Sequence, residues 1–311
     1  MNNGLKITAY AAVLAATFGV AYGVGNGVDP LVAAEARPAP EHGGHGTEQE
    51  GAAGAAAGPA GGLEASDGGY TLELRTPVVD AGARTGIRFA VVEDATGRKV
   101  TAYQREHGKE LHFILASRDL GTYRHLHPVR AADGTWSVPA DLPAAGDYRA
   151  FADFTPAAAG ARNLVLGADL AVSGDYRPKA LPAARATAVT DGYRVDLDGG
   201  LKAGRESDLK LTVSRNGRPV TDLQPYLGAY GHLVALRSGD LAYLHVHPAD
   251  GGPGPAVSFA ATAPSGGTYR LFLDFRHGGK VHTAAFTVDA EKQAGPDAGR
   301  GQSPAPDGHA H

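Results

Sequence analysis

The amino-acid sequence predicts an all-β protein with two β-sandwich modules in tandem. Two similar segments follow one another along the chain, and each contains short runs in which apolar and polar residues alternate, as in strands with one buried face. Gly, Pro, Asp or Asn interrupts these runs roughly every eight to twelve residues. About seven strands in about 100 residues is typical of an immunoglobulin-like domain. We therefore expect two immunoglobulin-like sandwiches.

The internal repeat is the most informative feature of the chain. The first copy contains ELHFILASRDLGTYRHLHP and AAGDYRAFADF, and the second contains GHLVALRSGDLAYLHVHP and SGGTYRLFLDF. Three histidines recur in the same order, and the second follows the first by thirteen positions in both copies. They are His112, His125 and His127 in the first copy and His232, His245 and His247 in the second.

An apolar run at residues 7–24 predicts a single N-terminal transmembrane helix. Eighteen helical residues span roughly 27 Å, which is close to the hydrocarbon thickness of a bilayer. Lys6 places the short end in the cytoplasm. A cleaved signal peptide is the alternative, with a candidate cleavage sequence at residues 34–36. Both interpretations export everything after residue 30, so we expect a single-pass cell-membrane protein with an extracytoplasmic C-terminal part, or a secreted one.

The composition divides the chain into six segments. Two of them are rich in Ala, Gly and Pro and contain almost no large apolar residue, which predicts disorder. The linker between the modules is rich in Pro and Ala and is short enough to allow a fixed arrangement. The expected segments are an anchor at 1–30, a disordered tether at 31–69, module one at 70–175, a linker at 176–188, module two at 189–289 and a disordered tail at 290–311.

The composition also excludes several classes of function. The chain has no Cys and a single Met, the initiator, which excludes disulfides, thiol catalysis and sulfur ligands for Cu(I). Its 29 basic residues are dispersed and the net charge is −4, which argues against nucleic acid as a partner. Neither G-x-S-x-G nor H-E-x-x-H occurs, and no small-molecule substrate is evident, so we expect no enzyme.

Strand geometry predicts that the repeated histidines converge. If a two-residue loop at Ser238-Gly239 closes the hairpin, His232 lies directly opposite His245, with His247 as the diagonal neighbour on the same face. A loop at Arg118-Asp119 gives the same geometry in the first copy. Such neighbours are close enough for their imidazoles to share a metal ion, whereas an odd loop would scatter them. Both faces of these strands are apolar, so the pattern does not say which one is the core.

A further hairpin over Gly278-Gly279 places two more histidines on one face of the second copy. The equivalent stretch of the first copy has none, which favours module two as the metal site. Asp274 and Asp153 could orient an imidazole ring from behind, or form ordinary strand-end ion pairs. The candidate ligands are His232, His245, His247 and His282, followed by His277 and, in module one, His112, His125 and His127.

Nitrogen ligands without sulfur suit copper(II), zinc(II) or nickel(II), and copper(II) is favoured by intrinsic affinity. A proton switch is another option, because clustered imidazoles titrate near neutrality. The alternative is a structural role in which the histidines bind backbone groups at the end of a sandwich. Four histidines in the predicted tether and tail could hold metal only loosely: His42, His45, His309 and His311.

Two further patterns predict core features of the sandwiches. Residues 142–148 and 265–269 place a Tyr after a turn that leads into a penultimate strand, as in a tyrosine corner. The single Trp of the chain, Trp136, is expected to pack in the core of module one.

The paired motifs, with H-x-H-P as the most specific element, resemble a family of membrane-anchored or secreted proteins of high-GC Gram-positive bacteria that is similar to YtkA-like extracytoplasmic domains. The resemblance covers roughly residues 66–289. It implies an association with copper or other heavy-metal handling, with the membrane and metal-transport or efflux proteins as partners, and it assigns no ligand. We expect a protein that binds or buffers a transition metal, copper(II) first; a non-enzymatic cell-surface interaction or scaffold module is the alternative.

Overall fold

The computed structural model of the chain describes residues 60–244 and 246–291. The predicted membrane helix, residues 31–59 of the predicted tether, nearly all of the predicted tail and His245 lie outside the described residues. No helix within the described part is long and apolar enough to cross a membrane. The described residues form strands, turns and loops, in agreement with the predicted all-β fold.

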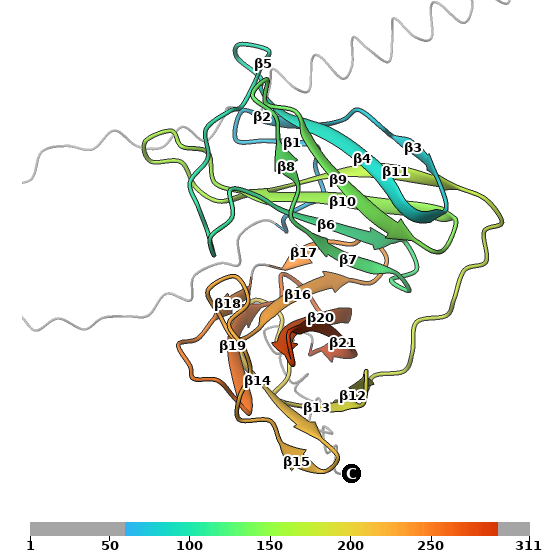
Figure 1. Cartoon of the computed structure of the whole chain (residues 1–311), viewed down its shortest axis with the longest axis vertical. Helices are drawn as coiled ribbons and strands as arrows, with labels where there is room; N and C mark the ends of the chain where they lie inside the picture. The colour runs from blue at the N-terminus through green and yellow to red at the C-terminus, as the bar shows by residue number, and fades with distance from the viewer. Residues whose placement is uncertain (1–59, 245, 292–311) are drawn as a thin grey trace, which may run out of the picture. The chain divides into compact units, whose positions relative to one another are not determined.

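Module one is a sandwich of two β-sheets (Figure 1). The first sheet has the order β1 (Ser66–Asp67), β2 (Tyr70–Leu74), β4 (Gly82–Glu93), β9 (Trp136–Leu142) and β8 (Val129–Arg130), and β5 (Arg98–Lys99) also pairs with β4. The second sheet has the order β3 (Val78–Asp80), β11 (Leu164–Ser173), β10 (Gly146–Phe154), β6 (His112–Ser117) and β7 (Tyr123–Leu126). All of these pairs are antiparallel except β3 with β11.

Module two repeats this arrangement with fewer strands. Its first sheet has the order β12 (Thr187–Thr190), β13 (Tyr193–Asp198), β14 (Glu206–Arg215), β19 (Ala256–Thr262) and β18 (Val246–Pro248), and β15 (Arg218–Pro219) also pairs with β14. Its second sheet has the order β17 (Tyr243–Leu244), β16 (His232–Arg237), β20 (Gly267–His277) and β21 (Lys280–Ala290).

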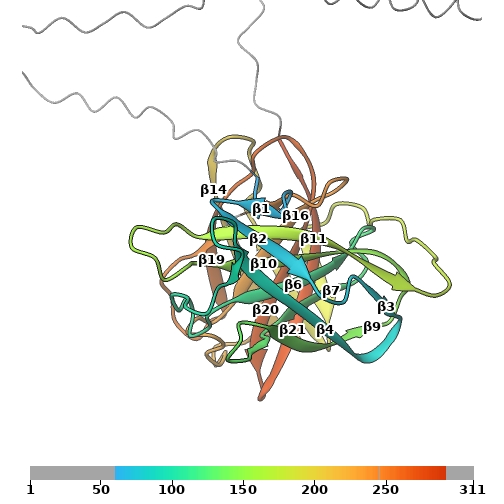
Figure 2. The same cartoon turned by 90° about the horizontal axis from the view of Figure 1, so that it is seen from above.

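The pairing in both modules is that of an immunoglobulin-like sandwich. In module one β4 pairs with β9 in one sheet, while β10 lies between β6 and β11 in the other (Figure 2). Strands β14, β19, β16, β20 and β21 repeat these pairings in module two. The prediction of two tandem immunoglobulin-like modules is therefore confirmed.

Aromatic packing fills the core of module one as the sequence predicts. Trp136 is 3% exposed, and its ring stacks on Phe89 at a centroid distance of 6.3 Å. The Phe89 ring in turn stacks on Phe113, at 4.3 Å. The indole Nε1–H of Trp136 donates to the Tyr103 hydroxyl at 3.2 Å, which satisfies the only polar atom of the buried ring.

Both predicted tyrosine corners are present. The Tyr148 hydroxyl donates to the carbonyl of Ala144, and the Tyr269 hydroxyl donates to the carbonyl of Ser265, each at 2.8 Å. The two tyrosine rings are buried at the start of β10 and β20. Each hydroxyl thus fixes the turn that precedes its strand, at equivalent positions of the two modules.

The boundary between the tether and module one differs from the prediction, because residues 60–69 belong to the module. The buried Arg149 guanidinium donates to the carbonyls of Gly62 and Leu63, each at 2.7 Å. The amide of Gly62 also donates to the Val165 carbonyl at 2.8 Å. The segment is ordered by backbone contacts, which its small side chains do not reveal in the sequence. Similarly, residues 187–188 of the predicted linker begin β12.

A third apolar cluster joins the two sandwiches, and it lies on the outer faces of the β6 and β16 sheets. Module one contributes Ile114, Ala116, Leu120, Tyr123 and Phe151, and module two contributes Val234, Leu236, Leu241, Tyr243 and Phe272. The Tyr123 ring stacks on the Phe272 ring at 4.1 Å, with 4° between the planes. Strands β6 and β16 are therefore buried on both faces.

Candidate metal centre

Strands β6 and β7 set the spacing of the module-one histidines. The amide of Ser117 donates to the carbonyl of Thr122 at 2.9 Å, which closes a loop of four residues, 118–121. Ile114 therefore pairs with His125, and the predicted direct pairing of His112 with His125 across a two-residue loop is wrong by a slip of two residues. Because the loop still has an even number of residues, the prediction that His112 and His125 share a face is confirmed.

The four-residue loop is stabilised by its own aspartate. Asp119 Oδ1 accepts from the Ser117 hydroxyl at 2.6 Å and from the Gly121 amide at 3.0 Å. Leu120 adopts a left-handed conformation, with φ of 55°, and its side chain is buried in the cluster between the modules. Hairpin β16–β17 of module two has the same register. The amide of Arg237 donates to the Ala242 carbonyl at 2.9 Å, and Leu236 pairs with Tyr243. The two-residue loop predicted there is wrong in the same way.

The shared histidine face is the one that points toward the other module. His112 and His125 lie on the face of Ile114 and Tyr123, both of which belong to the apolar cluster between the sandwiches. The opposite face carries Phe113 in the core of module one. The imidazoles are therefore placed at the junction of the two modules.

Three imidazoles of module one converge at this junction. One nitrogen each of His112, His125 and His127 can be chosen so that all three lie within 4.8 Å of one another. The closest pair is His112 Nδ1 and His125 Nε2, at 3.1 Å. His127 Nε2 is buried and has no hydrogen-bond partner among the described residues. A buried imidazole nitrogen without a partner costs free energy unless a ligand occupies it.

The protonation of the two facing nitrogens follows from their partners. His112 Nε2 lies 3.3 Å from the carbonyl of Glu106, which can only accept, so Nε2 carries the hydrogen and Nδ1 has a lone pair. His125 Nδ1 lies 3.0 Å from Asp274 Oδ2, so the same reasoning leaves a lone pair on Nε2 of neutral His125. The two lone pairs face each other at 3.1 Å. A cation between the rings, either a proton or a metal ion, removes this repulsion.

The separation of the two nitrogens suits a shared metal ion. Zinc binds imidazole nitrogens at about 2.0–2.1 Å, so two tetrahedral ligands are about 3.3 Å apart. The 3.1 Å between His112 Nδ1 and His125 Nε2 is close to that value.

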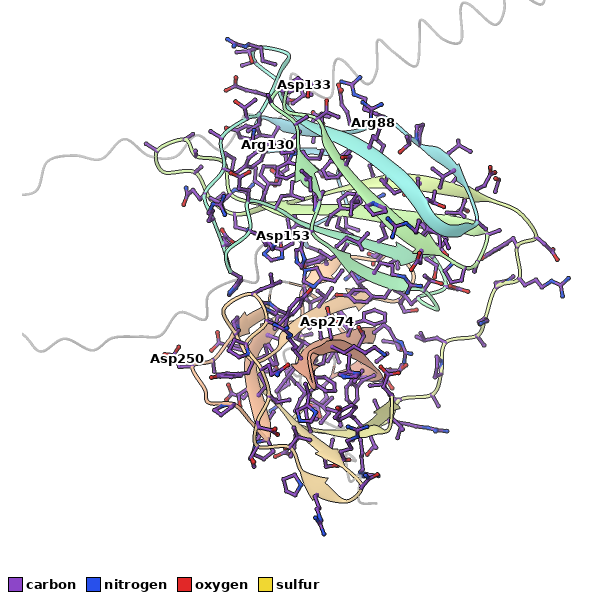
Figure 3. The ribbon with its side chains drawn as sticks, viewed as in Figure 1. Arg88, Arg130, Asp133, Asp153, Asp250 and Asp274 are labelled. Atoms are coloured by element: carbon purple, nitrogen blue, oxygen red, sulfur yellow. The ribbon has the colours of Figure 1, made fainter. Side chains whose placement is uncertain are left out.

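Asp274 orients His125 from the other module. This aspartate lies on β20, is 2% exposed, and also accepts from the Thr283 hydroxyl at 2.6 Å and the Tyr123 hydroxyl at 3.4 Å. Its equivalent in module one, Asp153, accepts from the Tyr243 hydroxyl of module two at 3.2 Å. Each aspartate therefore lies on the side of its own sandwich that meets the other one (Figure 3). Asp274 has the orienting role predicted as one of two options for it.

Burial keeps His112, His127 and His232 neutral. It lowers the pKa of His112 to about 3, with the neighbouring His125 and His127 adding to the effect. Burial, followed by the proximity of His125, also lowers the pKa of His127 to about 3. The pKa of His232 is lowered to about 4, again mainly by burial. Neutral imidazoles are the form that binds metal ions, so these rings are competent ligands at neutral pH.

The module-two triplet is described only in part. His232 is 8% exposed, and its Nε2 donates to the carbonyl of Tyr226 at 2.7 Å. His245 lies outside the described residues, and of His247 the structure describes only the backbone, which pairs with Ala260 in β18. Convergence of the second triplet therefore stays a prediction.

His277 and His282 do not join the other candidates. The predicted hairpin over Gly278-Gly279 is present, and both rings lie on the Phe275 face, which belongs to the core of module two. His232 pairs with Asp274 and lies on the opposite face of the sheet. The sheet itself therefore separates His282 from His232, contrary to the predicted set.

Both of these histidines have hydrogen-bond partners on both nitrogens. His277 Nδ1 lies 2.6 Å from the Tyr193 hydroxyl, and its Nε2 lies 3.1 Å from Asp222. His282 Nδ1 lies 2.7 Å from Asp191 Oδ2, and its Nε2 lies 3.3 Å from the carbonyl of His277. This arrangement is the structural role considered as the alternative for the histidines.

His107 is a member of the cluster that sequence reasoning missed. It begins a two-residue turn with Gly108, and both residues have positive φ, 50° and 76°. Its ring lies 5.1 Å from the ring of His232 and 6.2 Å from that of His112. The His-Gly pair five residues before His112 is a hairpin-turn signal that could have placed it. The equivalent residue of module two is Leu227, so the repeat alone does not reveal it.

A cavity of about 440 Å³ lies beside the cluster and is lined by both modules. Its polar lining includes Glu106, His107, His112, His125, Asp153 and Asn163 from module one and His232 and Tyr243 from module two. Small molecules or ions can therefore approach the imidazoles from one side.

Comparison with protein families identifies the same repeat. A family model described as "Domain of unknown function (DUF8832)" matches residues 64–163 and residues 187–292, which is one match per sandwich and more than half of the chain. The chain belongs to this family. The DUF8832 match begins at residue 64, just before β1 of module one and ahead of the predicted boundary at residue 70. No curated protein matches the chain significantly.

Several solved structures are similar to this chain at low sequence identity. The Escherichia coli adhesin FdeC is 16% identical, with 73% of this chain and 65% of that chain covered and a TM-score of 0.23. The D0-D1 domain of intimin is 10% identical, with 70% and 96% covered and a TM-score of 0.22. Invasin, a bacterial integrin-binding protein, is 12% identical, with 74% and 40% covered and a TM-score of 0.24. This chain thus spans about two thirds of the length of FdeC.

Proposed function

We propose that this DUF8832 protein is a non-enzymatic metal-binding protein that holds one divalent transition-metal ion between His112, His125 and His127. The observation that carries the proposal is the separation of 3.1 Å between His112 Nδ1 and His125 Nε2. Each of these nitrogens has a lone pair, because the other nitrogen of its ring donates to an acceptor. A bound cation turns the repulsion between these lone pairs into two coordinate bonds.

Two further features favour a metal ion over a proton as that cation. His127 Nε2 is buried without a partner beside the pair, and a proton shared by His112 and His125 leaves it unsatisfied. A metal ion can instead bind one nitrogen of each of the three rings, because such nitrogens lie within 4.8 Å of one another. Asp274 also holds the His125 ring through its other nitrogen, as carboxylates commonly do for metal-binding histidines.

Copper(II) and zinc(II) are the ions we propose, because nitrogen ligands without sulfur suit both and copper(II) binds such sites more tightly. The cavity beside the cluster leaves a path for ions to enter and leave, which fits buffering of the metal.

We also propose that this binding takes place outside the cytoplasm. Residues 7–24 have the length and composition of a membrane anchor, and the two sandwiches follow it. We further propose metal-transport or efflux proteins as partners, in line with the resemblance of the sequence motifs to YtkA-like domains.

A second candidate function is a cell-surface interaction or scaffold module with structural histidines. The fully hydrogen-bonded pair His277 and His282 favours it, because those two rings already have such a role. In this case a proton, rather than a metal ion, lies between His112 Nδ1 and His125 Nε2, while Asp274 holds the other nitrogen of His125.

Titration calorimetry with copper(II) and zinc(II) distinguishes the two functions. The protein is the full chain without an affinity tag, with His42, His45, His309 and His311 changed to Ala to remove loose binding by the terminal segments. We expect saturable binding of one ion, and the further substitution His127→Ala weakens it by at least about a hundredfold, because loss of a ligand exceeds the loss typical of its supporting groups.

The matched control is His277→Gln, which changes a hydrogen-bonded histidine on the opposite face of the sheet from His232 and leaves the affinity unchanged. Absence of saturable binding, or equal binding by the His127→Ala and His277→Gln proteins, would leave the scaffold function.

A further inference from the structure

The imidazole cluster has neighbours from both sandwiches, and this placement gives it a role in joining them. We propose that His232 of module two supplies a fourth nitrogen to the metal ion, so that the ion clamps the two sandwiches together; this inference rests on the proposed function. The ion is then both the cargo of the site and a cross-link between the modules.

The position of His232 suits a fourth ligand. Its ring centroid lies 6.4 Å from that of His112 and 6.2 Å from that of His125. The three rings of module one are 5.0–5.5 Å apart, so His232 is about one ångström farther than the members of the triplet are from each other. A small inward rotation brings it into the coordination sphere of an ion at the centre.

The hydrogen bonding of His232 leaves the correct nitrogen for this role. Its Nε2 donates to the Tyr226 carbonyl at 2.7 Å, so Nδ1 carries the lone pair. His112 is held in the same way, because its Nε2 faces the carbonyl of Glu106, the residue equivalent to Tyr226. Both rings therefore use a backbone carbonyl to fix the tautomer that binds metal through Nδ1.

Besides His232, module two contributes Asp274 to the same site. This residue pairs with His232 across β16 and β20, and its carboxylate holds His125 of module one. The Tyr123 hydroxyl reaches the same carboxylate. The groups that orient the ligands are thus the groups that join the sandwiches.

Binding and docking are coupled by this sharing of groups. If the sandwiches separate, His232 and Asp274 leave the site, and the ion keeps at most three nitrogen ligands. An ion that binds the docked arrangement more tightly must stabilise docking by the same factor.

The absence of cysteine in the chain allows a direct test. Val129→Cys in β8 and Val189→Cys in β12 place one spin label on each module, at side chains that are 72% and 75% exposed. Zinc(II) is the probe, because it is diamagnetic and does not relax the labels. Double electron–electron resonance on the full chain then reports the distribution of distances between the modules, with and without zinc(II).

We expect zinc(II) to narrow this distribution and EDTA to restore it. The substitution His232→Gln retains a donor for the Tyr226 carbonyl but removes the ligand, so it weakens zinc(II) binding by roughly ten- to a hundredfold and abolishes the narrowing. His277→Gln, in the same module, changes neither.

The outcomes separate this inference from the proposed function. If the labelled parent protein binds no metal, the proposed function fails. If it binds one zinc(II) ion but the distribution does not narrow, or if His232→Gln changes neither affinity nor narrowing, the clamp is refuted and the three-histidine site remains. The measurement on the parent protein decides the clamp even if the His232→Gln protein fails to fold.

Discussion

Asp274 determines the chemistry of the cluster at the level of single residues. A carboxylate that is 2% exposed is stable only when its oxygens are satisfied, and here Thr283, Tyr123 and His125 satisfy them. Because the carboxylate can only accept, it forces the hydrogen of His125 onto Nδ1 and turns Nε2 toward His112. One buried charge in module two thus sets the tautomer of a ring in module one.

The buried imidazoles predict that the metal-free protein loses stability in acid. The pKa values of His112 and His127 are lowered to about 3, from about 6.5 in the unfolded chain. Between these values the unfolded chain binds more protons than the folded one, so the free energy of unfolding falls as the pH decreases from about 6.5 toward 4. Urea unfolding at intervals between pH 7.5 and pH 4 measures this slope.

The substitution His127→Gln should make the dependence of the free energy of unfolding on pH shallower. It removes one of the groups that, between pH 7.5 and pH 4, bind a proton only in the unfolded chain. His277→Gln serves as the control. A wild-type free energy of unfolding that is constant over this range, or equal slopes for the wild-type and His127→Gln proteins, would contradict the assignment of neutral buried rings.

The hairpins show, at the level of secondary-structure elements, how far the sequence predicts the site. Alternation along a strand predicts which residues share a face, and the even loop placed His112 and His125 together as expected. It does not predict register, which here depends on the local hydrogen bonds of Asp119. It also cannot identify the core face, because Phe113 packs in its own sandwich while Ile114 packs against the other module.

The sequence also does not predict contacts that are made by backbone atoms. The segment at residues 60–64 contains little to bury, so its composition indicates disorder, yet Arg149 binds two of its carbonyls. Gly167 makes this contact possible, because a Cβ there would lie 2.0 Å from the carbonyl oxygen of Gly62.

The substitution Gly167→Ala should therefore detach this segment from module one. We expect a loss of stability of about 1–3 kcal/mol, typical of forcing an extra methyl group into a packed site. Urea unfolding gives the magnitude, and limited proteolysis near residue 62 shows the release directly. Gly86→Ala in β4 is the control, because its Cβ meets nothing within 4 Å and its φ is not in the left-handed region. Equal protease resistance of the two variants would show that Gly167 is not required for this contact.

At the scale of the molecule, the described residues form a duplicated sandwich whose two copies bind each other through equivalent surfaces. Tyr123 of module one reaches Asp274 of module two, and Tyr243 of module two reaches Asp153 of module one. The repeat predicts two modules of the same fold, but the docking surface is a property of the pair and leaves no signal beyond a strand that is apolar on both faces. An interface with an apolar centre and paired polar contacts limits the motion of the modules, and a shared metal ion would restrict the remaining motion further.

The stacked pair of Tyr123 and Phe272 tests whether the modules unfold as one unit. In the wild-type protein we expect a single calorimetric transition, because the apolar cluster between the sandwiches couples them. Phe272 is 4% exposed and its ring stacks on Tyr123 at 4.1 Å. Phe272→Ala should cost about 3–5 kcal/mol and split the transition in two.

Phe286→Ala is the control, because the Phe286 ring lies in the core of module two and does not belong to the apolar cluster between the modules. It should lower the melting temperature by a similar amount. The protein should still unfold in a single transition, because the intact interface couples the weakened module two to module one. Separate transitions in the wild-type protein would show that the sandwiches unfold independently, and the metal clamp would then have to join two otherwise independent modules. A single transition in both variants would show that the coupling does not depend on the stacked pair of Tyr123 and Phe272.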